Sequence, residues 1–279
     1  MTTTDSSSLM KTLQKNEVKV INAAVIIVIV FASLVPTGLP ITISDPTIKM
    51  YDGLSSLKSG EVVWFSFDQV FVVLPEVKAS IQAVLQHLFM IPGIKILITS
   101  SYADGPAIYE GMISVTNKYG KVYGTDYVFL GYVVGNELSI ANLARDIKVT
   151  CPVDNYGTPL ANLPMMDTIN GAKDIARYVT ITLGPQFYWY IRQVVAPYQI
   201  PMYTISVGYF LSEIMPFFAS GQLSGYIVGL KGGAEYETLI GTKGLASRGA
   251  DAMSLVYGLL MVAVVGVNIN YLRKHKGGK

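Results

Sequence analysis

Two apolar runs, Val62-Val-Trp-Phe-Ser-Phe67 and Ile94-Lys-Ile-Leu-Ile-Thr-Ser100, flank a segment of helical periodicity, and this arrangement decides the fold. Both runs are rich in β-branched and aromatic residues. They are apolar almost throughout rather than alternating, which is typical of strands covered on both faces. Between them, after Pro75, apolar residues recur at helical spacing over residues 76–90. Strand, helix and strand in this order predict a parallel crossover unit.

The same alternation continues along the chain. Three further runs of strand character cover residues 127–133, 178–183 and 202–207. Helical segments are predicted to begin at Pro106, after the capping residue Asn136, and at Pro185. The pattern predicts an α/β domain with a five-stranded, mainly parallel, doubly wound sheet of the Rossmann-like or flavodoxin-like kind. The interval 150–176, which holds several Pro and Gly residues, is expected to be an excursion over the surface.

Two runs without a charged residue, 20–44 and 252–272, are each long enough to cross a bilayer core, which takes about 20 apolar residues as helix. They predict membrane helices over residues 20–40 and 251–272, with an α/β domain over residues 41–250 between them. Each run also has the length of a buried core helix. The first run also has features of a cleaved signal peptide, but its apolar part is longer, so we expect an uncleaved anchor.

Basic residues flank the two runs on their outer sides. They are Lys11, Lys15 and Lys19 before the first run and Arg273, Lys274, Lys276 and Lys279 after the second. Positive charge favours the cytoplasmic side, so tails 1–19 and 273–279 are expected to be cytoplasmic and to contact anionic membrane lipids. The domain is then extracytoplasmic, at the plasma membrane. A third span over residues 214–230 would move the C-terminal tail outside.

Composition and missing motifs exclude several classes of protein. The chain is 51% hydrophobic and 14% charged, with a net charge of +2, which argues against disorder and against a nucleic-acid partner. We find no phosphate-binding loop, nucleophile elbow, His-Glu-x-x-His pair or Gly-x-Gly-x-x-Gly fingerprint. No cofactor, resident metal or catalytic residue is therefore predicted. His87 is more simply interpreted as a residue of a helix than as a general base. Cys151 is more simply interpreted as a loop thiol than as a nucleophile.

Candidate ligand-binding residues follow the predicted strands. Asp68, Asp104, Asn136 and Glu137 lie in or next to loops at the carboxyl ends of strands, where open parallel sheets bind ligands. The three carboxylates would suit a hard cation such as Mg²⁺ or Ca²⁺ if they met. Helix capping and turn formation are the alternative roles of the same residue types.

Glycines recur every four residues at Gly221, Gly225 and Gly229, which would place them on one face of a helix. Gly258 and Gly266 form a second small-residue pattern in the last apolar run. Such stripes let another backbone approach closely. We predict a helix-packing interface here, either between protomers of a homo-oligomer or within the domain itself.

Five stretches are moderately distinctive: Lys121-Val-Tyr-Gly-Thr-Asp-Tyr-Val-Phe-Leu-Gly-Tyr-Val-Val-Gly135, Asp154-Asn-Tyr-Gly-Thr-Pro-Leu160, Leu163-Pro-Met-Met166, Ser220-Gly-Gln-Leu223 and Gly229-Leu-Lys-Gly-Gly-Ala-Glu-Tyr-Glu237. In these stretches the chain resembles an uncharacterised family of prokaryotic membrane-anchored proteins. The resemblance covers about residues 60–270. The family has no assigned activity, so it transfers no catalytic role to any residue.

Three functions remain open at the level of sequence. The first is a non-enzymatic membrane-anchored scaffold or assembly subunit, which self-associates or joins a larger membrane complex. The second is a surface or periplasmic enzyme or ligand receptor that uses the strand-end loops. The third is a transporter or pore component, which the absence of charged residues from the runs 20–44 and 252–272 disfavours.

Overall fold

The structure is a computed structural model that describes residues 17–34, 38–133 and 136–276. The chain divides into two compact units. One unit, Ile41–Ala246, contains the sheet. The other combines Met1–Pro40 with Ser247–Lys279 and contains α2 (Glu17–Leu34) and most of α12 (Leu245–Lys276).

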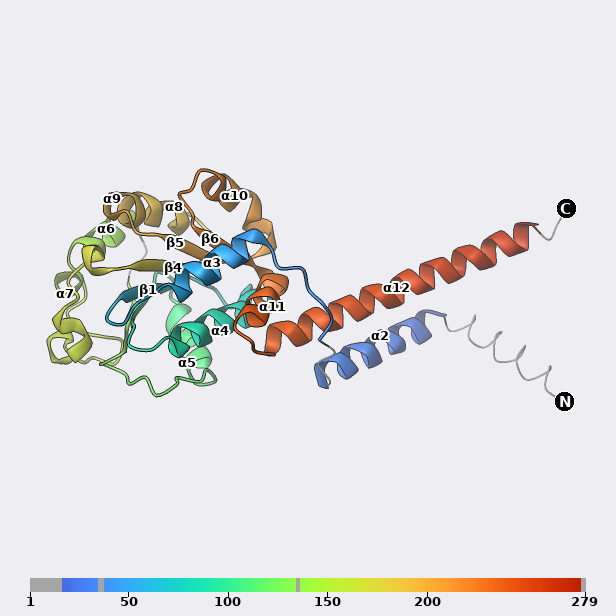
Figure 1. Ribbon diagram of the computed structural model, residues 1–279, viewed down its shortest axis with the longest axis horizontal. Coiled ribbons are helices and arrows are strands. Elements are labelled where there is room, and N and C mark those ends of the chain that lie inside the picture. Colours follow the sequence, from blue (N-terminus) through green and yellow to red (C-terminus); the bar gives the residue numbers. More distant parts are fainter. Residues whose placement is uncertain (1–16, 35–37, 134–135, 277–279) are drawn as a thin grey trace. The chain divides into compact units, whose positions relative to one another are not determined.

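The sheet in the described part of the chain has six parallel strands in the order β3-β2-β1-β4-β5-β6 (Figure 1). The strands are β1 (Val62–Phe67), β2 (Lys95–Ser100), β3 (Tyr127–Tyr132), β4 (Arg177–Thr182), β5 (Met202–Ser206) and β6 (Gly225–Val228). The parallel α/β fold is confirmed, and the five expected strands are present. The expected strand number is corrected from five to six, because β6 was not predicted.

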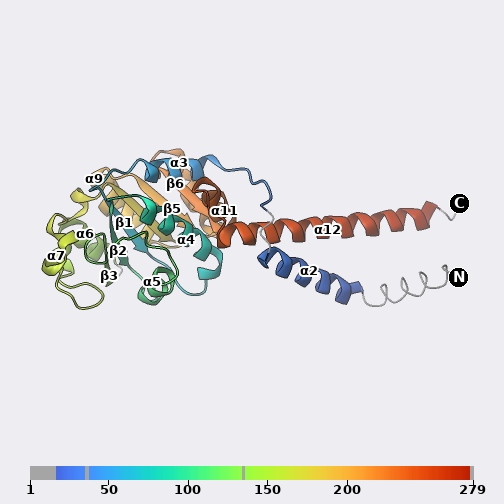
Figure 2. The same cartoon turned by 60° about the horizontal axis from the view of Figure 1, so that its bottom comes forward.

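Helices cover both faces of the sheet (Figures 1 and 2). On one face, Phe67 of β1 meets Tyr109 with ring centroids 5.9 Å apart. On the other, Tyr178 of β4 meets Tyr190 with centroids 4.9 Å apart. The helices of the domain are α3 (Asp45–Ser55), α4 (Leu74–Met90), α5 (Gly105–Ile113), α6 (Glu137–Arg145), α7 (Ile147–Thr150), α8 (Gln186–Tyr190), α9 (Ala196–Tyr198), α10 (Leu211–Ala219) and α11 (Gly229–Leu239).

Two short elements interrupt the regular pattern near the site regions. A π-helical turn, η4 (Ile191–Val195), joins α8 to α9. A 3₁₀ turn, η5 (Gly208–Phe210), follows β5. Helix starts predicted from Pro75, Pro106 and Asn136 are confirmed, because α4 and α5 carry a proline in their first turn and Asn136 caps α6.

The segment between α7 and β4 was expected to be an excursion over the surface, and many of its residues are exposed, but it is also anchored in the core. It forms three 3₁₀ turns, η1 (Leu160–Asn162), η2 (Pro164–Asp167) and η3 (Ala172–Asp174). Met165, Met166 and Ile169 within it are fully buried. The backbone N–H of Asn155 also donates to the carbonyl of Phe129 at 2.9 Å, so the segment pairs with β3. Its apolar side chains complete the core beside that edge strand.

The glycines at 221, 225 and 229 do not lie on one helix face, so the predicted helix is wrong. Gly221 is in a turn with φ 79°, Gly225 begins strand β6, and Gly229 begins α11 with φ 54°. A Cβ on Gly225 would lie 2.6 Å from the backbone nitrogen of Met50. The close backbone approach is therefore real at Gly225, but it joins α3 to β6 inside the domain.

We expect Gly225→Ala to lower the free energy of unfolding by about 1–3 kcal/mol, because the new methyl group would overlap backbone that has to move. The matched control is Gly111→Ala in α5, where a Cβ meets open space. That change should raise stability by about 0.5–1 kcal/mol through helix propensity. Chemical denaturation of the full chain in detergent, followed by the fluorescence of Trp64 and Trp189, measures both. Equal stability of the two variants would contradict the α3–β6 contact.

The second unit contains the apolar helices. The described part of the chain has one helical stretch long and apolar enough to cross a membrane, Leu245–Ile269 in α12. The apolar part of α2, Ile21–Phe31, is shorter than a span. The carboxylate of Asp251 in α12 accepts hydrogen bonds from the backbone N–H groups of Gly38 at 2.8 Å and Leu39 at 3.2 Å. Asp251 thus ties the chain that follows α2 to α12.

Candidate functional site

One face of the sheet carries a row of buried hydroxyl groups near the carboxyl ends of the central strands. In β1 and β2, Ser66 pairs in register with Thr99, and across β1 and β4 it pairs with Thr180. The row continues from β4 to β5 through Thr180 with Thr204 and Thr182 with Ser206. All of these side chains are at most 2% exposed. In β1 and β4 the residues that alternate with these hydroxyl groups, Phe65, Phe67, Val179 and Ile181, are apolar and fully buried.

Asp68 lies directly after β1 at the end of this row and is fully buried. Its carboxylate accepts hydrogen bonds from Ser66 Oγ at 2.6 Å and from the Ser101 N–H and Oγ at 2.7 Å each. Burial raises the pKa of Asp68, and the hydrogen bonds from Ser66 and Ser101 oppose that rise. A buried acid held by donors from two neighbouring strands is a feature of functional sites as well as of structural networks.

Several polar atoms around Asp68 have no hydrogen-bond partner among the described residues. They are both side-chain atoms of the Gln69 amide and the hydroxyls of Thr180 and Thr182. A buried polar group left unpaired costs about 1–3 kcal/mol, and such groups in proteins usually bind ordered water or a ligand. The Tyr190 hydroxyl, which closes the network from α8, lies 3.0 Å from Ser66 Oγ.

A side-chain bridge spans the carboxyl end of β1. The Tyr102 hydroxyl, in the loop after β2, donates to Gln186 Oε1 at the start of α8, after β4, at 3.0 Å. β2 and β4 are the two neighbours of β1, so the bridge crosses the point where the strand order reverses. Ligands of open α/β sheets bind at this point. In this chain the Tyr102–Gln186 bridge lies there, next to the Asp68 network.

The predicted ligand residues are not brought together. Asp104 accepts the Phe71 N–H at 3.2 Å, and Asn136 accepts the Ser139 N–H at 2.8 Å as the cap of α6. Glu137 is paired with Arg192 at 2.9 Å, and hydrogen bonds from Arg192 and Gln193 lower the pKa of Glu137 to about 2. No group of three His, Cys, Asp or Glu that would hold a metal occurs in residues 17–34, 38–133 and 136–276. Asn136 therefore has the alternative capping role, Glu137 is in an ion pair, and Asp104 contacts the loop after β1 through the Phe71 N–H.

Sequence reasoning found Asp68 but missed its partners. Ser66, Ser101 and Tyr190 come from three separate elements, and only the fold brings them together. A local signal did exist, since Thr180 and Thr182 alternate with apolar residues in β4. Such alternation normally marks a solvent-exposed face, whereas here both threonines are buried. Cys151 is half-buried, and burial raises the pKa of its thiol, which disfavours the reactive thiolate.

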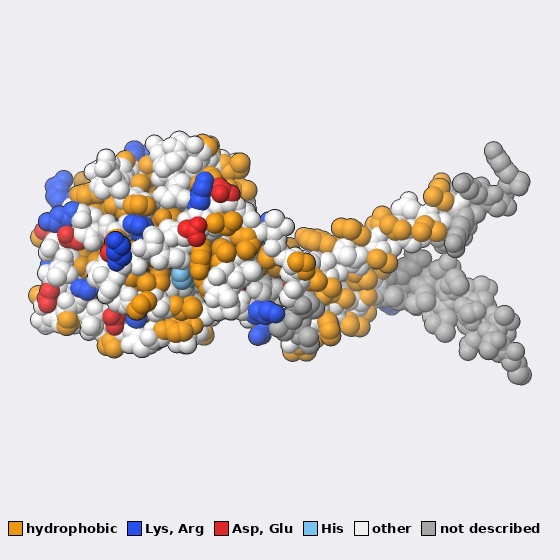
Figure 3. Space-filling view, in the orientation of Figure 1, with side chains coloured by type: hydrophobic (Ala, Val, Ile, Leu, Met, Phe, Trp, Pro, Cys, Tyr) orange, Lys and Arg blue, Asp and Glu red, His pale blue; other side chains and the backbone are white. Residues whose placement is uncertain are grey.

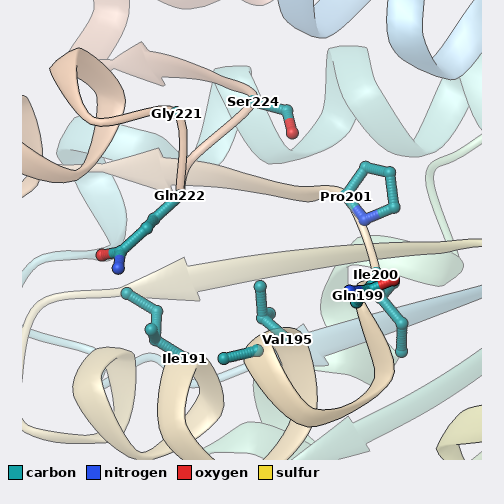
Figure 4. Close-up of a pocket in the computed structure, with 9 residues that line it drawn as sticks. Ile191, Val195, Gln199, Ile200, Pro201, Gly221, Gln222 and Ser224 are labelled. Atoms are coloured by element: carbon teal, nitrogen blue, oxygen red, sulfur yellow. The ribbon is translucent and has the colours of Figure 1, made fainter.

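A pocket of about 310 Å³ lies at the opposite, amino edge of the sheet (Figure 4). It is bounded by the π-helical turn η4, by residues 199–201 before β5, and by residues 221–224 before β6. Its volume is at the lower end of the range for small-molecule sites, roughly 300–1,000 Å³. The sequence analysis contained no signal for this pocket.

Comparisons with protein-family models, with curated proteins and with solved structures give no match to this chain. This outcome agrees with the resemblance to an uncharacterised family. The chemistry of the chain therefore has to be argued from its own residues.

We expect Asp68 to make the domain less stable as pH rises from the ordinary pKa of an aspartate, about 4, toward the raised pKa that Asp68 has in the folded state. Because burial raises the pKa of Asp68, the folded state binds more protons than the unfolded state between the two pKa values. The free energy of unfolding therefore falls as pH rises through that interval. Asp68→Asn should remove this part of the pH dependence, as measured by chemical denaturation of the full chain at several pH values.

The measurement is best made in a His87→Gln background. Burial lowers the pKa of His87 to about 4. His87 therefore makes the free energy of unfolding fall as pH falls through this range, which is opposite to the effect of Asp68. Gln retains groups that can bond the Tyr236 hydroxyl, which lies 2.7 Å from His87 Nδ1. Identical pH slopes with and without the Asp68 carboxylate would show that its burial has no influence on stability.

Proposed function

We propose that the chain is a membrane-anchored, non-enzymatic subunit whose α/β domain joins a larger membrane complex. The observation that carries the membrane part is the apolar stretch of α12. Only 6% of its most apolar 18-residue window is buried, and Val262 and Val267 are 71% and 69% exposed. Figure 3 shows hydrophobic side chains along the outside of the helical segment. Exposure of so much apolar surface is costly in water and favourable in lipid.

The connection between α2 and α12 supports a helical hairpin as the anchor. Asp251 accepts two backbone N–H groups from the chain that leaves α2, as an anchored turn requires. With basic residues at both outer ends, the hairpin would place both tails in the cytoplasm and residues 41–250 outside. In this arrangement α2 enters the membrane as a companion of α12.

Both connections of the domain are held by α11, which also supports a hairpin. On the entry side, Glu235 accepts the Ser44 N–H at 3.1 Å, the Ser44 Oγ–H at 2.6 Å and the Thr47 Oγ1–H at 2.7 Å. On the exit side, Glu237 accepts the backbone N–H groups of Gly244 and Ala246, each at 2.9 Å. Two carboxylates two positions apart in α11 therefore hold the points where the chain enters and leaves the domain. A single membrane surface is the simplest location for two such connections.

The assembly role is supported by exposed apolar side chains around the carboxyl edge of the sheet. Phe71 and Val72 in the loop after β1 are 53% and 83% exposed, Leu138 in the first turn of α6 is 70% exposed, and Tyr209 after β5 is 63% exposed. We call these four residues the carboxyl-edge patch. These residues share one edge of the sheet because they follow β1, β3 and β5, and exposed apolar surface that is contiguous marks contacts with other molecules. Gly221, Gly225 and Gly229 give no support to assembly, because they do not form one face of a helix.

A ligand receptor is the second candidate, and one observation favours it. The buried Gln69 amide has no partner at either polar atom, and it follows Asp68 at the switch point of the sheet. A small polar ligand that reached this point would satisfy the amide. A receptor does not require the carboxyl-edge patch, so the two candidates can be separated.

We expect protease added to intact spheroplasts to cut the domain and to leave N- and C-terminal tags intact. The reason is that both basic tails are expected on the cytoplasmic side. Immunoblots against the two tags and the domain measure the outcome, and detergent-permeabilised cells are the control. Labelling of the C-terminal tag from outside would contradict the hairpin and would favour an odd number of spans.

We expect Val72→Glu in the carboxyl-edge patch to weaken assembly by roughly ten-fold or more, because a charge would be buried in an apolar contact. Chemical crosslinking in intact membranes, followed by size analysis, measures the assembly. The matched control is Val149→Glu on α7, since Val149 is 79% exposed but lies outside the patch. A wild-type chain that is already monomeric and free of partners would remove the subunit proposal and leave the receptor.

A further inference from the structure

We propose that the pocket at the amino edge of the sheet binds a small uncharged molecule with an apolar body and an amide-like group. The pocket of about 310 Å³ is formed by three segments at the amino edge of the sheet (Figure 4). They are the π-helical turn η4, the residues that lead into β5 and the turn that leads into β6. This site is independent of the carboxyl-edge patch and of the membrane anchor.

The floor of the pocket is apolar. Ile191, Val195 and Ile200 line it and are 6%, 7% and 4% exposed. In Figure 4 the side chains of Ile191 and Val195 rise from the helix on the side that faces Gln222. A ligand with an apolar body would cover the small area that these side chains leave open, together with the exposed Ala196 and the half-buried Pro201, at about 25 cal/mol for each Å² removed from water.

The rim of the pocket is polar but carries no charge. Gln199 and Gln222 are exposed lining residues, Ser224 is half-buried, and none of the nine lining residues is ionisable. A charged ligand would lose hydration here without meeting an opposite charge, which disfavours its binding. A primary amide offers both a donor and an acceptor. Two such amides on the rim complement a ligand group that also offers both, such as a carboxamide.

The backbone around the pocket has two unusual conformations. The turn at 191–195 is π-helical, a form that is rare and occurs often at functional sites. Gln199 ends α9 in the left-handed region with φ 53°, a position where glycine or asparagine is favoured. Holding a residue other than glycine there costs roughly 1–3 kcal/mol. The cost is understandable if the Gln199 amide is needed at the rim.

The experiment uses the full chain in lipid nanodiscs with methyl-labelled isoleucine, and N-acetyl-leucine N-methylamide as the probe. This probe is uncharged and combines an apolar side chain with amide groups. We expect saturable chemical-shift changes at the methyl groups of Ile191 and Ile200. N-acetyl-leucine, which carries a carboxylate, should bind about ten-fold more weakly or worse, because the pocket holds no counter-charge. N-methylacetamide, which lacks the apolar body, should also bind more weakly.

Two rim variants test the role of the amides. Gln222→Ala and Gln199→Gly should each weaken binding of the probe about five-fold, the effect of one hydrogen bond. Gln199→Gly should also keep or raise the melting temperature, because glycine adopts φ 53° without strain. The control is Tyr198→Ala, since Tyr198 is an exposed neighbour on α9 that does not line the pocket. It should leave the affinity unchanged.

Three results would overturn the proposal. The first is an absence of saturable shifts at Ile191 and Ile200 up to the solubility limit of the probe, including the case in which only other isoleucines respond. The second is equal binding of the carboxylate and the neutral probe, which would remove the uncharged ligand class. The third is unchanged affinity in both rim variants. None of these results bears on membrane insertion or on assembly through the carboxyl-edge patch.

Discussion

Parallel strands cannot be joined by tight turns, so every connection in this domain has to cross a face of the sheet. This constraint covers both faces with helices and buries the six strands between them. It also buries the hydroxyl row from Ser66 to Ser206, which would be a solvated face in an antiparallel sheet. The hydrogen bonds around Asp68 follow from that burial, because a carboxylate cannot stay in the interior without donors. The Gln69 amide and the hydroxyls of Thr180 and Thr182 are parts of this region that the described residues leave without a hydrogen-bond partner.

The edges of the sheet differ in chemistry, and the two edges suggest separate roles. The carboxyl edge combines the buried Asp68 network with the exposed carboxyl-edge patch. The amino edge has an apolar pocket with an uncharged polar rim. Between them α11 runs from Gly229, at the carboxyl end of β6, to the carboxylates that hold both connections of the domain. One helix therefore fixes where the chain enters and leaves the fold.

Local patterns were sufficient for most of the sheet. The five strands predicted from apolar runs are present, and Pro75, Pro106 and Asn136 mark helix starts as expected. β6 was missed because a glycine period of four has the spacing of a helix face, although the three glycines serve a turn, a strand and a helix start. The segment that holds Met165 was placed on the surface because Pro and Gly normally mark loops. In both cases the residue pattern is real, but the contacts that explain it are made with residues far away in the sequence.

The amino-acid sequence alone determined the features that depend on neighbouring residues: the parallel α/β class, the helix starts and the long apolar run of α12. The tertiary structure decided every feature that depends on residues far apart in the chain. Asp68 meets Ser101 33 residues later, and Ser44 meets Glu235 191 residues later. Gly225 is required because the backbone of Met50 lies against it. The physical reason is that periodicity and capping are short-range properties of the backbone. Hydrogen bonds and close packing between distant segments exist only once the crossovers have placed those segments together.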